Sequence, residues 1–360
     1  MPALIAPEIK IPAGKLASLR TISLHELESG SIDESLSLLQ TCVEDGFFYL
    51  DLTHPDHFCL LECVQDIFDM SQSLFNYPSE VKNLFDVDKV SPLKLNGYKP
   101  KGRNITAKDG RGDGFESWAL PRNGLLHLSD EPFPHPPIVA SHQEQLRALI
   151  RFLNRATCTI MSSLSTSLLI PKGQRFEDFQ GLHRPSPDLL RLLKYHPEVN
   201  PVGVPQTPHT DMGSLTFVFS DTPGLQVLPV HVSQGLGAYD ESDWLYVAPK
   251  PGHAVVNVGD CLTMMSNGLL KSALHRVGPV AGCAMPERYS MAYLARPEDH
   301  AMLRGVPSPL LPCRASGKDE EEAVTSGDWI QRKFKALRGR NAANKASFDQ
   351  VITGGRGVLV

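Results

Sequence analysis

The sequence predicts a mainly β fold with additional helices, in which an antiparallel jelly-roll core is covered by helices that precede it in the chain. Two observations support this prediction. Before Pro187, apolar residues recur every three or four positions over long stretches, which is the spacing of one face of an α-helix. After Pro187, eight short apolar runs are separated by Gly, Pro, Asn and Asp, which is typical of antiparallel strands joined by tight turns and not of a parallel sheet.

The N-terminal part predicts alternating helices and strands. Residues 21–24 are a short strand candidate, and residues 31–45 carry apolar side chains at helical spacing up to a glycine that ends the helix. The aromatic run at 47–50 predicts a buried strand, and residues 55–74 predict a second helix packed on a core. Residues 76–135 are rich in Pro, Gly, Asn, Asp and Lys, so we expect mostly turns there.

Residues 141–169 carry the clearest helical pattern, because apolar side chains step by three and four along the whole stretch. A helix of this length spans roughly 40 Å and can cover an entire sheet. We therefore expect it to be a long scaffold helix. The predicted strands follow at residues 191–196, 214–220, 225–229, 245–249, 254–258, 262–265, 272–277 and 289–295.

The C-terminal part contains an acidic run at 319–322, a helix candidate at 328–337 and a polar, Gly-rich end. Residues 1–186 are accordingly expected to form an N-terminal helical and irregular cover that includes the scaffold helix. Residues 187–300 are expected to form the jelly-roll core, and residues 301–360 a C-terminal helix with a flexible tail.

Composition and charge exclude several classes of protein. The chain has 360 residues, of which 41% are hydrophobic, and its 35 Lys and Arg are scattered among 40 Asp and Glu, so no nucleic-acid partner is expected. It has no run of about 18 apolar residues, so no membrane span is expected. The seven cysteines show no C-x-x-C pair, which predicts reduced thiols in a cytoplasmic protein.

The pattern His-x-Asp/Glu occurs four times, whereas the composition alone predicts about one or two occurrences. It begins at His54, His142, His196 and His209. The first and third copies enclose a proline, and the second begins the scaffold helix, where residues two apart face different directions. We expect the copy at His54 to be a turn and a helix cap. Only His209 and Asp211 stand at the start of a predicted strand, on which side chains two apart share a face.

A third ligand for a metal is predicted at His275, on a different strand. A lone histidine is more often structural, but Arg288 and Ser290 follow on a further strand and would project to one side of it. A guanidinium beside a hydroxyl forms a fork for a carboxylate. Two histidines and one carboxylate suit Fe(II) with open coordination positions.

These motifs together resemble the isopenicillin N synthase-like family of Fe(II)/2-oxoglutarate dioxygenases, especially its fungal members. The resemblance covers most of the chain and rests on an ordered set of short motifs. They lie at residues 42–49, 97–98, 116–117, 208–211, 223–227, 251–252, 259–260, 266–268, 271–272, 275–277 and 288–290.

The resemblance implies a double-stranded β-helix, with Fe(II) held by His209, Asp211 and His275. It also implies that 2-oxoglutarate, a co-substrate, is anchored by Arg288 and Ser290. The implied reaction uses O2, with ascorbate as an accompanying reductant. It oxidises an unactivated C–H bond of a small organic substrate by hydroxylation, desaturation or rearrangement, and the fungal resemblance places it in secondary-metabolite biosynthesis.

Tyr195 falls where this family places a tyrosine that also reaches the carboxylate of the oxo acid. The family usually has Asn two residues before this tyrosine and Tyr-Pro after it, whereas here Leu193 precedes it and His196 and Pro197 follow. Substrate contacts are expected from groups around the pocket. The candidates are residues 94–103, 115–118, Phe217, Phe219 and the region of Trp329.

Three other functions stay open at the level of the sequence. The first is an iron oxidase of the same fold that uses no 2-oxoglutarate, against which Arg288 and Ser290 argue. The second is a jelly-roll binding protein without catalysis, and the third is a zinc hydrolase with two His ligands and one Asp. A zinc hydrolase would have no use for Arg288.

Overall fold

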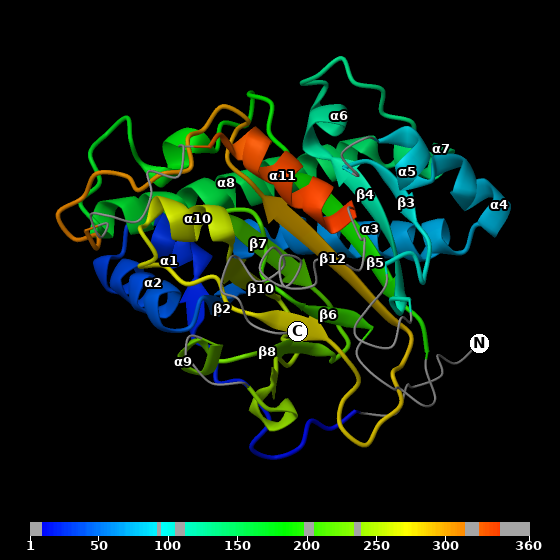
Figure 1. Ribbon diagram of the computed structural model, residues 1–360, viewed down its shortest axis with the longest axis horizontal. Coiled ribbons are helices and arrows are strands. Elements are labelled where there is room, and N and C mark those ends of the chain that lie inside the picture. Colours follow the sequence, from blue (N-terminus) through cyan, green and yellow to red (C-terminus); the bar gives the residue numbers. More distant parts are fainter. Residues whose placement is uncertain are drawn as a thin grey trace.

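The computed structural model describes residues 9–91, 95–104, 112–197, 205–233, 239–313 and 324–338. Two β-sheets form the centre of the protein, and helices cover the outer face of the larger sheet (Figure 1). In neighbour order, the larger sheet contains β1 (Thr21–Ser23), β2 (Phe47–Asp51), β10 (His253–Val258), β7 (Leu215–Phe219), β12 (Arg288–Ala295), β5 (Leu189–Tyr195), β4 (Phe115–Pro121) and β3 (Gly97–Lys99). The smaller sheet contains β6 (Gln206–His209), β11 (His275–Val277), β8 (Leu225–Val227) and β9 (Leu245–Tyr246).

Apart from the parallel pair β1 and β2, neighbouring strands run antiparallel. This confirms the predicted jelly-roll core with helical cover. The helices are α1 (Leu24–Glu28), α2 (Ile32–Glu44), α3 (Phe58–Phe75), α4 (Ser79–Lys82), α5 (Val87–Val90), α6 (Arg122–Leu126), α7 (Pro137–Ser141), α8 (Gln143–Ser167), α9 (Val230–Ser233), α10 (Asp260–Met265) and α11 (Ser326–Arg338). Short 3₁₀ turns lie at Pro55–His57, Asn83–Phe85, Phe176–Phe179 and Glu241–Asp243.

Helix α8 is the predicted scaffold helix, and its 25 residues run along the larger sheet. Leu146, Ile150, Leu153 and Leu164 are buried on the face that packs against this sheet. Their spacing of three or four residues places them on one side of the helix, so burial of this stripe fixes α8 to the sheet. A turn at His142 separates α8 from α7, so the helix begins two residues later than predicted.

Apolar side chains form two main cores. The first lies between the helices and the larger sheet, and the second lies between the two sheets. The strands alternate between the cores: Leu190 and Leu192 of β5 contribute to the first, and Leu193 and Tyr195 to the second. This period of two is expected for β-strands, and it brings polar residues of β5, β7, β10 and β12 into the space between the sheets.

Two sequence predictions are wrong. Residues 262–265 form part of helix α10 and not a strand, because a run of four apolar residues fits a buried helix turn as well as a strand. The turn-rich region 76–135 contains strand β4, which pairs along its whole length with β5. The predicted helix at 328–337 is confirmed as α11. The acidic run at 319–322 and the C-terminal end lie outside the described residues.

Strands β1 to β4 from the N-terminal part belong to the same sheet as the strands after residue 187. The sheet therefore crosses the predicted boundary at residue 186. The division of the chain at residues 186 and 300 stays a prediction. None of the helices that the structure describes is both long enough and apolar enough to span a membrane.

Candidate active site

Three side chains with metal-ligating atoms meet between the two sheets. His209 ends β6 and lies opposite His275, the first residue of β11. Nε2 of His209 lies 3.9 Å from Oδ1 of Asp211, and Nε2 of His275 lies 3.8 Å from Oδ2 of the same carboxylate. One ligating atom of each residue lies within 4.8 Å of the other two. The structure thus brings together the three residues that the sequence predicts as ligands.

The backbone reaches Asp211 by a path that differs from the prediction. We expected His209 and Asp211 to alternate on one strand, but β6 ends at His209 and Asp211 lies in the turn before β7. The start of α10 holds this turn, because the amide of Asp260 donates to the carbonyl of Asp211 over 2.8 Å. A Cβ on Gly259 would lie 2.3 Å from the carbonyl oxygen of Gly213, so this close approach requires glycine.

The ionised carboxylate of Asp211 and the tautomer of His275 suit the binding of a metal ion. Burial alone would raise the pKa of Asp211, but the neighbouring His275 and His209 and a 2.9 Å hydrogen bond from Asn257 outweigh burial and lower this pKa to about 2. Nδ1 of His275 lies 3.2 Å from the carbonyl of Ala273, which can only accept. The proton therefore sits on Nδ1, and Nε2 presents its lone pair toward Asp211. Two imidazoles and an ionised carboxylate are the donor set of mononuclear Fe(II) sites.

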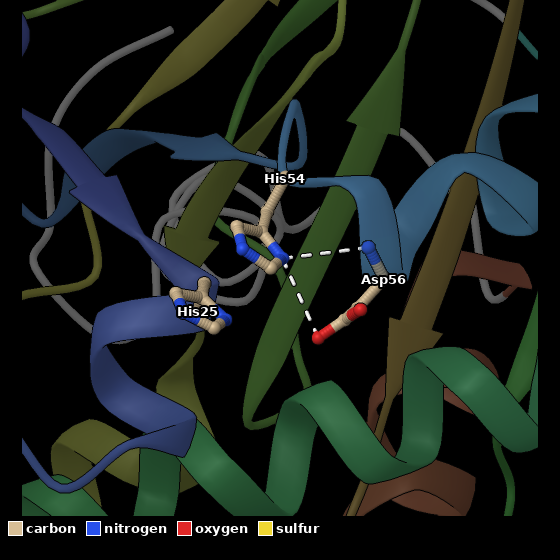
Figure 2. Close-up of side chains that lie close together, drawn as sticks. All are labelled: His25, His54 and Asp56. Carbon is tan, nitrogen blue, oxygen red and sulfur yellow. Dashed lines mark hydrogen bonds and ion pairs between the residues drawn. The ribbon is translucent and has the colours of Figure 1, made fainter.

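One other group of potential ligands occurs among the described residues, at His25, His54 and Asp56 (Figure 2). Nδ1 of His54 accepts a 3.4 Å hydrogen bond from the amide of Asp56 and so caps the turn at Pro55–His57, as predicted. The rings of His25 and His54 are stacked, with centroids 3.5 Å apart and planes 9° apart. Parallel stacked rings do not direct their lone pairs at one ion, so we assign this group a capping and packing role.

Arg288 and Ser290 lie side by side on β12, as predicted from their spacing. Nη1 of Arg288 donates to Oγ of Ser290 over 3.1 Å, and Nε donates to the carbonyl of Thr222 over 3.0 Å. Burial lowers the pKa of Arg288, and its guanidinium carbon lies 5.1 Å from the centre of the Tyr195 ring. The arginine is therefore held in a fixed direction between two strands, with its other donors available to an anion.

Tyr195 connects the arginine to the metal ligands. Its hydroxyl donates to Oε1 of Gln206 over 2.6 Å, and Nε2 of Gln206 lies 3.2 Å from Nε2 of His209. Burial raises the pKa of Tyr195 to about 12, so the phenol stays protonated. Leu193, where the resembled family usually has Asn, is an apolar wall residue between the sheets. Gln206 was not predicted, because its role depends on the cross-strand distance to Tyr195.

A pocket reaches Arg288 from the space between the sheets. Its apolar wall includes Val218, Leu225 and Val255, while Lys250 and Arg288 supply positive charge. This pocket adjoins Arg288 only, since none of His209, Asp211 and His275 lines it.

The predicted substrate contacts differ in where their side chains lie. Phe115 lies between the sheets, with its ring centre 5.4 Å from that of Tyr195. Four other predicted contacts pack in the helix-covered core and do not line the site: Trp118, Phe217, Phe219 and Trp329. Phe217, Phe219 and Trp118 lie on strand faces that point away from the site, and Trp329 lies on helix α11. Of the predicted loop at 94–103, the first residue lies outside the described residues.

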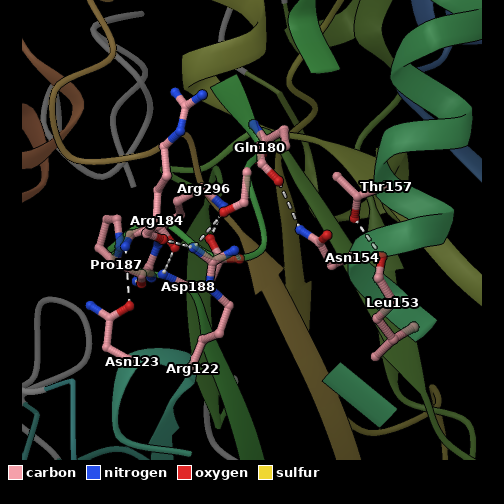
Figure 3. Close-up of polar contacts among 12 residues, drawn as sticks. Arg122, Asn123, Leu153, Asn154, Thr157, Gln180, Arg184, Pro187, Asp188 and Arg296 are labelled. Atoms are coloured by element: carbon pink, nitrogen blue, oxygen red, sulfur yellow. Dashed lines mark hydrogen bonds and ion pairs between the residues drawn. The ribbon is translucent and has the colours of Figure 1, made fainter. Parts of the chain in front are cut away.

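A buried polar network fixes the ends of β5 and β12, which carry much of the site (Figure 3). Asp188, next to β5, accepts hydrogen bonds from Nη1 of Arg122 over 3.1 Å, from the hydroxyl of Tyr293 over 2.7 Å and from the amide of Arg296 over 2.6 Å. Arg296 also donates to the carbonyl of Pro187. The two strands are thereby held at one end by ionic hydrogen bonds.

Comparison with known proteins points in the same direction. Residues 187–297 match the 2OG-Fe(II) oxygenase superfamily. The chain is 31% identical to the 2-oxoglutarate-dependent dioxygenase gloE of Glarea lozoyensis over 346 residues, which cover 96% of this chain and 95% of that protein. It is 32% identical to the 2-oxoglutarate-dependent dioxygenase frbH of a Dothideomycetidae species, over 94% of this chain and 96% of that protein.

Solved structures show the same fold. A full-length Neurospora crassa protein, crystallised with alpha-KG and thymine, matches with a TM-score of 0.71 at 22% identity. The match covers 91% of this chain and 98% of that one. A rice dioxygenase for auxin oxidation matches with a TM-score of 0.62 at 22% identity, over 91% and 98% of the two chains.

Proposed function

This chain belongs to the Fe(II)- and 2-oxoglutarate-dependent dioxygenases, and from that premise we propose that His209, Asp211 and His275 bind its iron. The observation that carries the proposal is the convergence of their three ligating atoms from two strands and one turn within 4.8 Å. The low pKa of Asp211 keeps the carboxylate ionised over the physiological pH range, and the hydrogen bond to Ala273 selects the tautomer of the neutral His275 ring in which Nε2 faces the metal.

We assign the anchoring of 2-oxoglutarate to Arg288, with Ser290 and Tyr195 in support. A guanidinium can hold a carboxylate through two parallel hydrogen bonds, and Ser290 adds a hydroxyl beside it. Tyr195 has its ring against Arg288 and its hydroxyl directed to Gln206. It therefore lies between the proposed carboxylate anchor and the proposed iron ligands.

When bound, Fe(II) and 2-oxoglutarate would supply the oxidising power, since oxidative decarboxylation of the oxo acid by O2 would yield succinate and CO2. The chain's own residues supply placement, because such an oxidant has little selectivity of its own. The hydrogen bonds to Thr222 and from Asn257 fix the directions of Arg288 and Asp211, so both groups would meet the reactants without rearrangement. We propose that the reaction oxidises a C–H bond of a small secondary metabolite by hydroxylation, desaturation or rearrangement.

We also propose a cytoplasmic location. The support comes from the seven cysteines, all of which lie within the described residues and are free thiols. Free thiols are usual where proteins are kept under reducing conditions.

An anaerobic titration tests the site. Wild-type protein with Fe(II) and 2-oxoglutarate should develop a weak visible absorption band, and this band should be absent in Asp211→Ala. A flat wild-type spectrum would favour a binding protein without iron chemistry. Once a substrate is found, succinate formed per product distinguishes the two oxidative mechanisms, because a product without succinate would indicate an oxidase that does not use the oxo acid.

A further inference from the structure

Arg191 lies in the middle of β5, on the same face as Leu193 and Tyr195. Residues two apart on a strand share a face, so Arg191 projects into the space between the sheets. Its neighbours in register are Ala119 of β4 and Ala292 of β12. Because both are small, the guanidinium is not packed against long side chains on either side.

Arg191 has no hydrogen bond and no ion pair with any residue that the structure describes, and its Nε is buried without a partner. The four arginines that are fully buried in the described part of the chain all have partners. Arg122 contacts Asp188, Arg276 contacts Glu241, Arg288 contacts Ser290 and Arg296 contacts the carbonyl of Pro187. Arg191 is partly buried, and a cation with a buried Nε and no described protein partner, beside the proposed reaction site, points to a ligand.

Burial lowers the pKa of Arg191, and the charge of Asp211, the proposed iron ligand, opposes this effect without forming an ion pair. In the complete site, the negative charges of Asp211 and of 2-oxoglutarate are matched by the iron and by Arg288. The charge of Arg191 then has no counterpart among the described groups. Lys99 is a further cation nearby, but its Nζ already contacts the carboxylate of Asp113 over 2.7 Å.

We infer that Arg191 is the anion-binding residue for the primary substrate, and that this substrate carries a carboxylate on an apolar body. The inference rests on the proposed function. The apolar body of the substrate is inferred from the neighbours of Arg191. Leu189 and Leu294 form a buried apolar cluster with Ala119 beside it. A single cation next to an apolar wall selects an amphipathic acid, because the charge is paired while the body is removed from water.

The test uses three matched probe pairs: phenylacetate and phenylacetamide, benzoate and benzamide, and hexanoate and hexanamide. Binding to the anaerobic Fe(II)–2-oxoglutarate protein is measured by calorimetry for wild type, Arg191→Met, Arg191→Lys and the exposed control Arg155→Met. At least one acid should bind wild type and Arg155→Met about tenfold more tightly than its amide, the size of one charge-assisted hydrogen-bonded pair. Arg191→Met should lose this preference and Arg191→Lys should keep part of it.

Two further readouts separate this inference from other roles. The affinity for 2-oxoglutarate should be unchanged in Arg191→Met, and its unfolding temperature should equal or exceed that of wild type, because the variant breaks no described hydrogen bond or ion pair and removes a partly buried cation without a partner. The inference is overturned if no acid is preferred by wild type, if Arg191→Met keeps the preference, if it loses 2-oxoglutarate binding, or if it unfolds several degrees lower. Failure of wild type to bind Fe(II) and 2-oxoglutarate would instead overturn the proposed function.

Discussion

The hydroxyl of Tyr195 and the amide oxygen of Gln206 lie 2.6 Å apart and join the two sheets at the candidate site. Tyr195 belongs to the larger sheet and Gln206 to the smaller one. Because Gln206 also approaches His209, this hydrogen bond connects the proposed oxo-acid anchor with a proposed iron ligand. It fixes the distance between two groups that have to act on one molecule of 2-oxoglutarate.

Tyr195→Phe is expected to raise the 2-oxoglutarate concentration needed for half-maximal turnover about two- to tenfold, with a smaller effect on the maximal rate. The substitution removes one neutral hydrogen bond, which contributes about 1 kcal/mol. Steady-state kinetics with varied 2-oxoglutarate checks this. Tyr246→Phe is the matched control, because the hydroxyl of Tyr246 donates to the carbonyl of Pro279, away from the proposed anchor. Equal effects of both variants would contradict a role of Tyr195 at the oxo acid.

Arg288→Met is expected to raise the 2-oxoglutarate requirement about tenfold to a hundredfold. The variant removes a charge-assisted pair, for which roughly 1.5–3 kcal/mol is typical. Arg288→Lys should fall between this variant and wild type, because an ammonium keeps the charge but not the paired geometry. An unchanged requirement in Arg288→Met would show that another residue anchors the oxo acid.

His209→Ala, Asp211→Ala and His275→Ala should each abolish turnover and leave less than stoichiometric iron after dialysis. Each removes one of three protein ligands, and the site has no described residue to replace it. Metal analysis of the dialysed proteins checks this prediction. The control is His253→Ala, whose Nδ1 contacts the carbonyl of Pro251 at the other end of β10. Full iron content in Asp211→Ala would show that a different carboxylate binds the metal.

Long periodic patterns predicted the helices well, because α8 and α2 bury one stripe of side chains along many turns. Short apolar runs did not, and α10 was predicted as a strand. The role of α10 is visible only in the folded structure, where the amide of its first residue, Asp260, donates a hydrogen bond to the carbonyl of Asp211. The three iron ligands, Arg288 and Ser290 follow from motif order and strand alternation.

Other parts of the site are not visible in the sequence. The contribution of Asn257 depends on its register opposite β7, and that of Gln206 depends on the distance between two sheets. Arg191 was also not predicted, because nothing in the sequence distinguishes it from other arginines on strands. Its distinguishing feature is the lack of a partner among the described residues, and only the folded structure shows this.

Breaking the buried Arg122–Asp188 pair should lower the free energy of unfolding by about 3–5 kcal/mol, because the buried carboxylate of Asp188 would lose its ion-pair partner. Arg122→Met is the test variant, followed by urea denaturation. Arg184 is the matched control in the same region (Figure 3). Its side chain is 65% exposed and pairs with Glu298, whereas that of Arg122 is 1% exposed. Arg184→Met should cost less than about 1 kcal/mol. Similar losses in both variants would contradict a special role of the buried pair.

Glu116 should make the folded protein sensitive to acid. Burial alone would raise its pKa, but contacts with His196, Lys82 and Tyr98 outweigh burial and lower it from 4.5 to about 2. Because the folded pKa lies below the unfolded one, the stabilisation is complete above about pH 5 and is lost as the pH falls toward 2. The shift corresponds to roughly 3 kcal/mol. Urea denaturation between pH 7 and about pH 3 should therefore show a smaller decline for Glu116→Gln than for wild type or for the exposed control Glu144→Gln. Parallel declines in all three proteins would show that Glu116 does not carry this acid sensitivity.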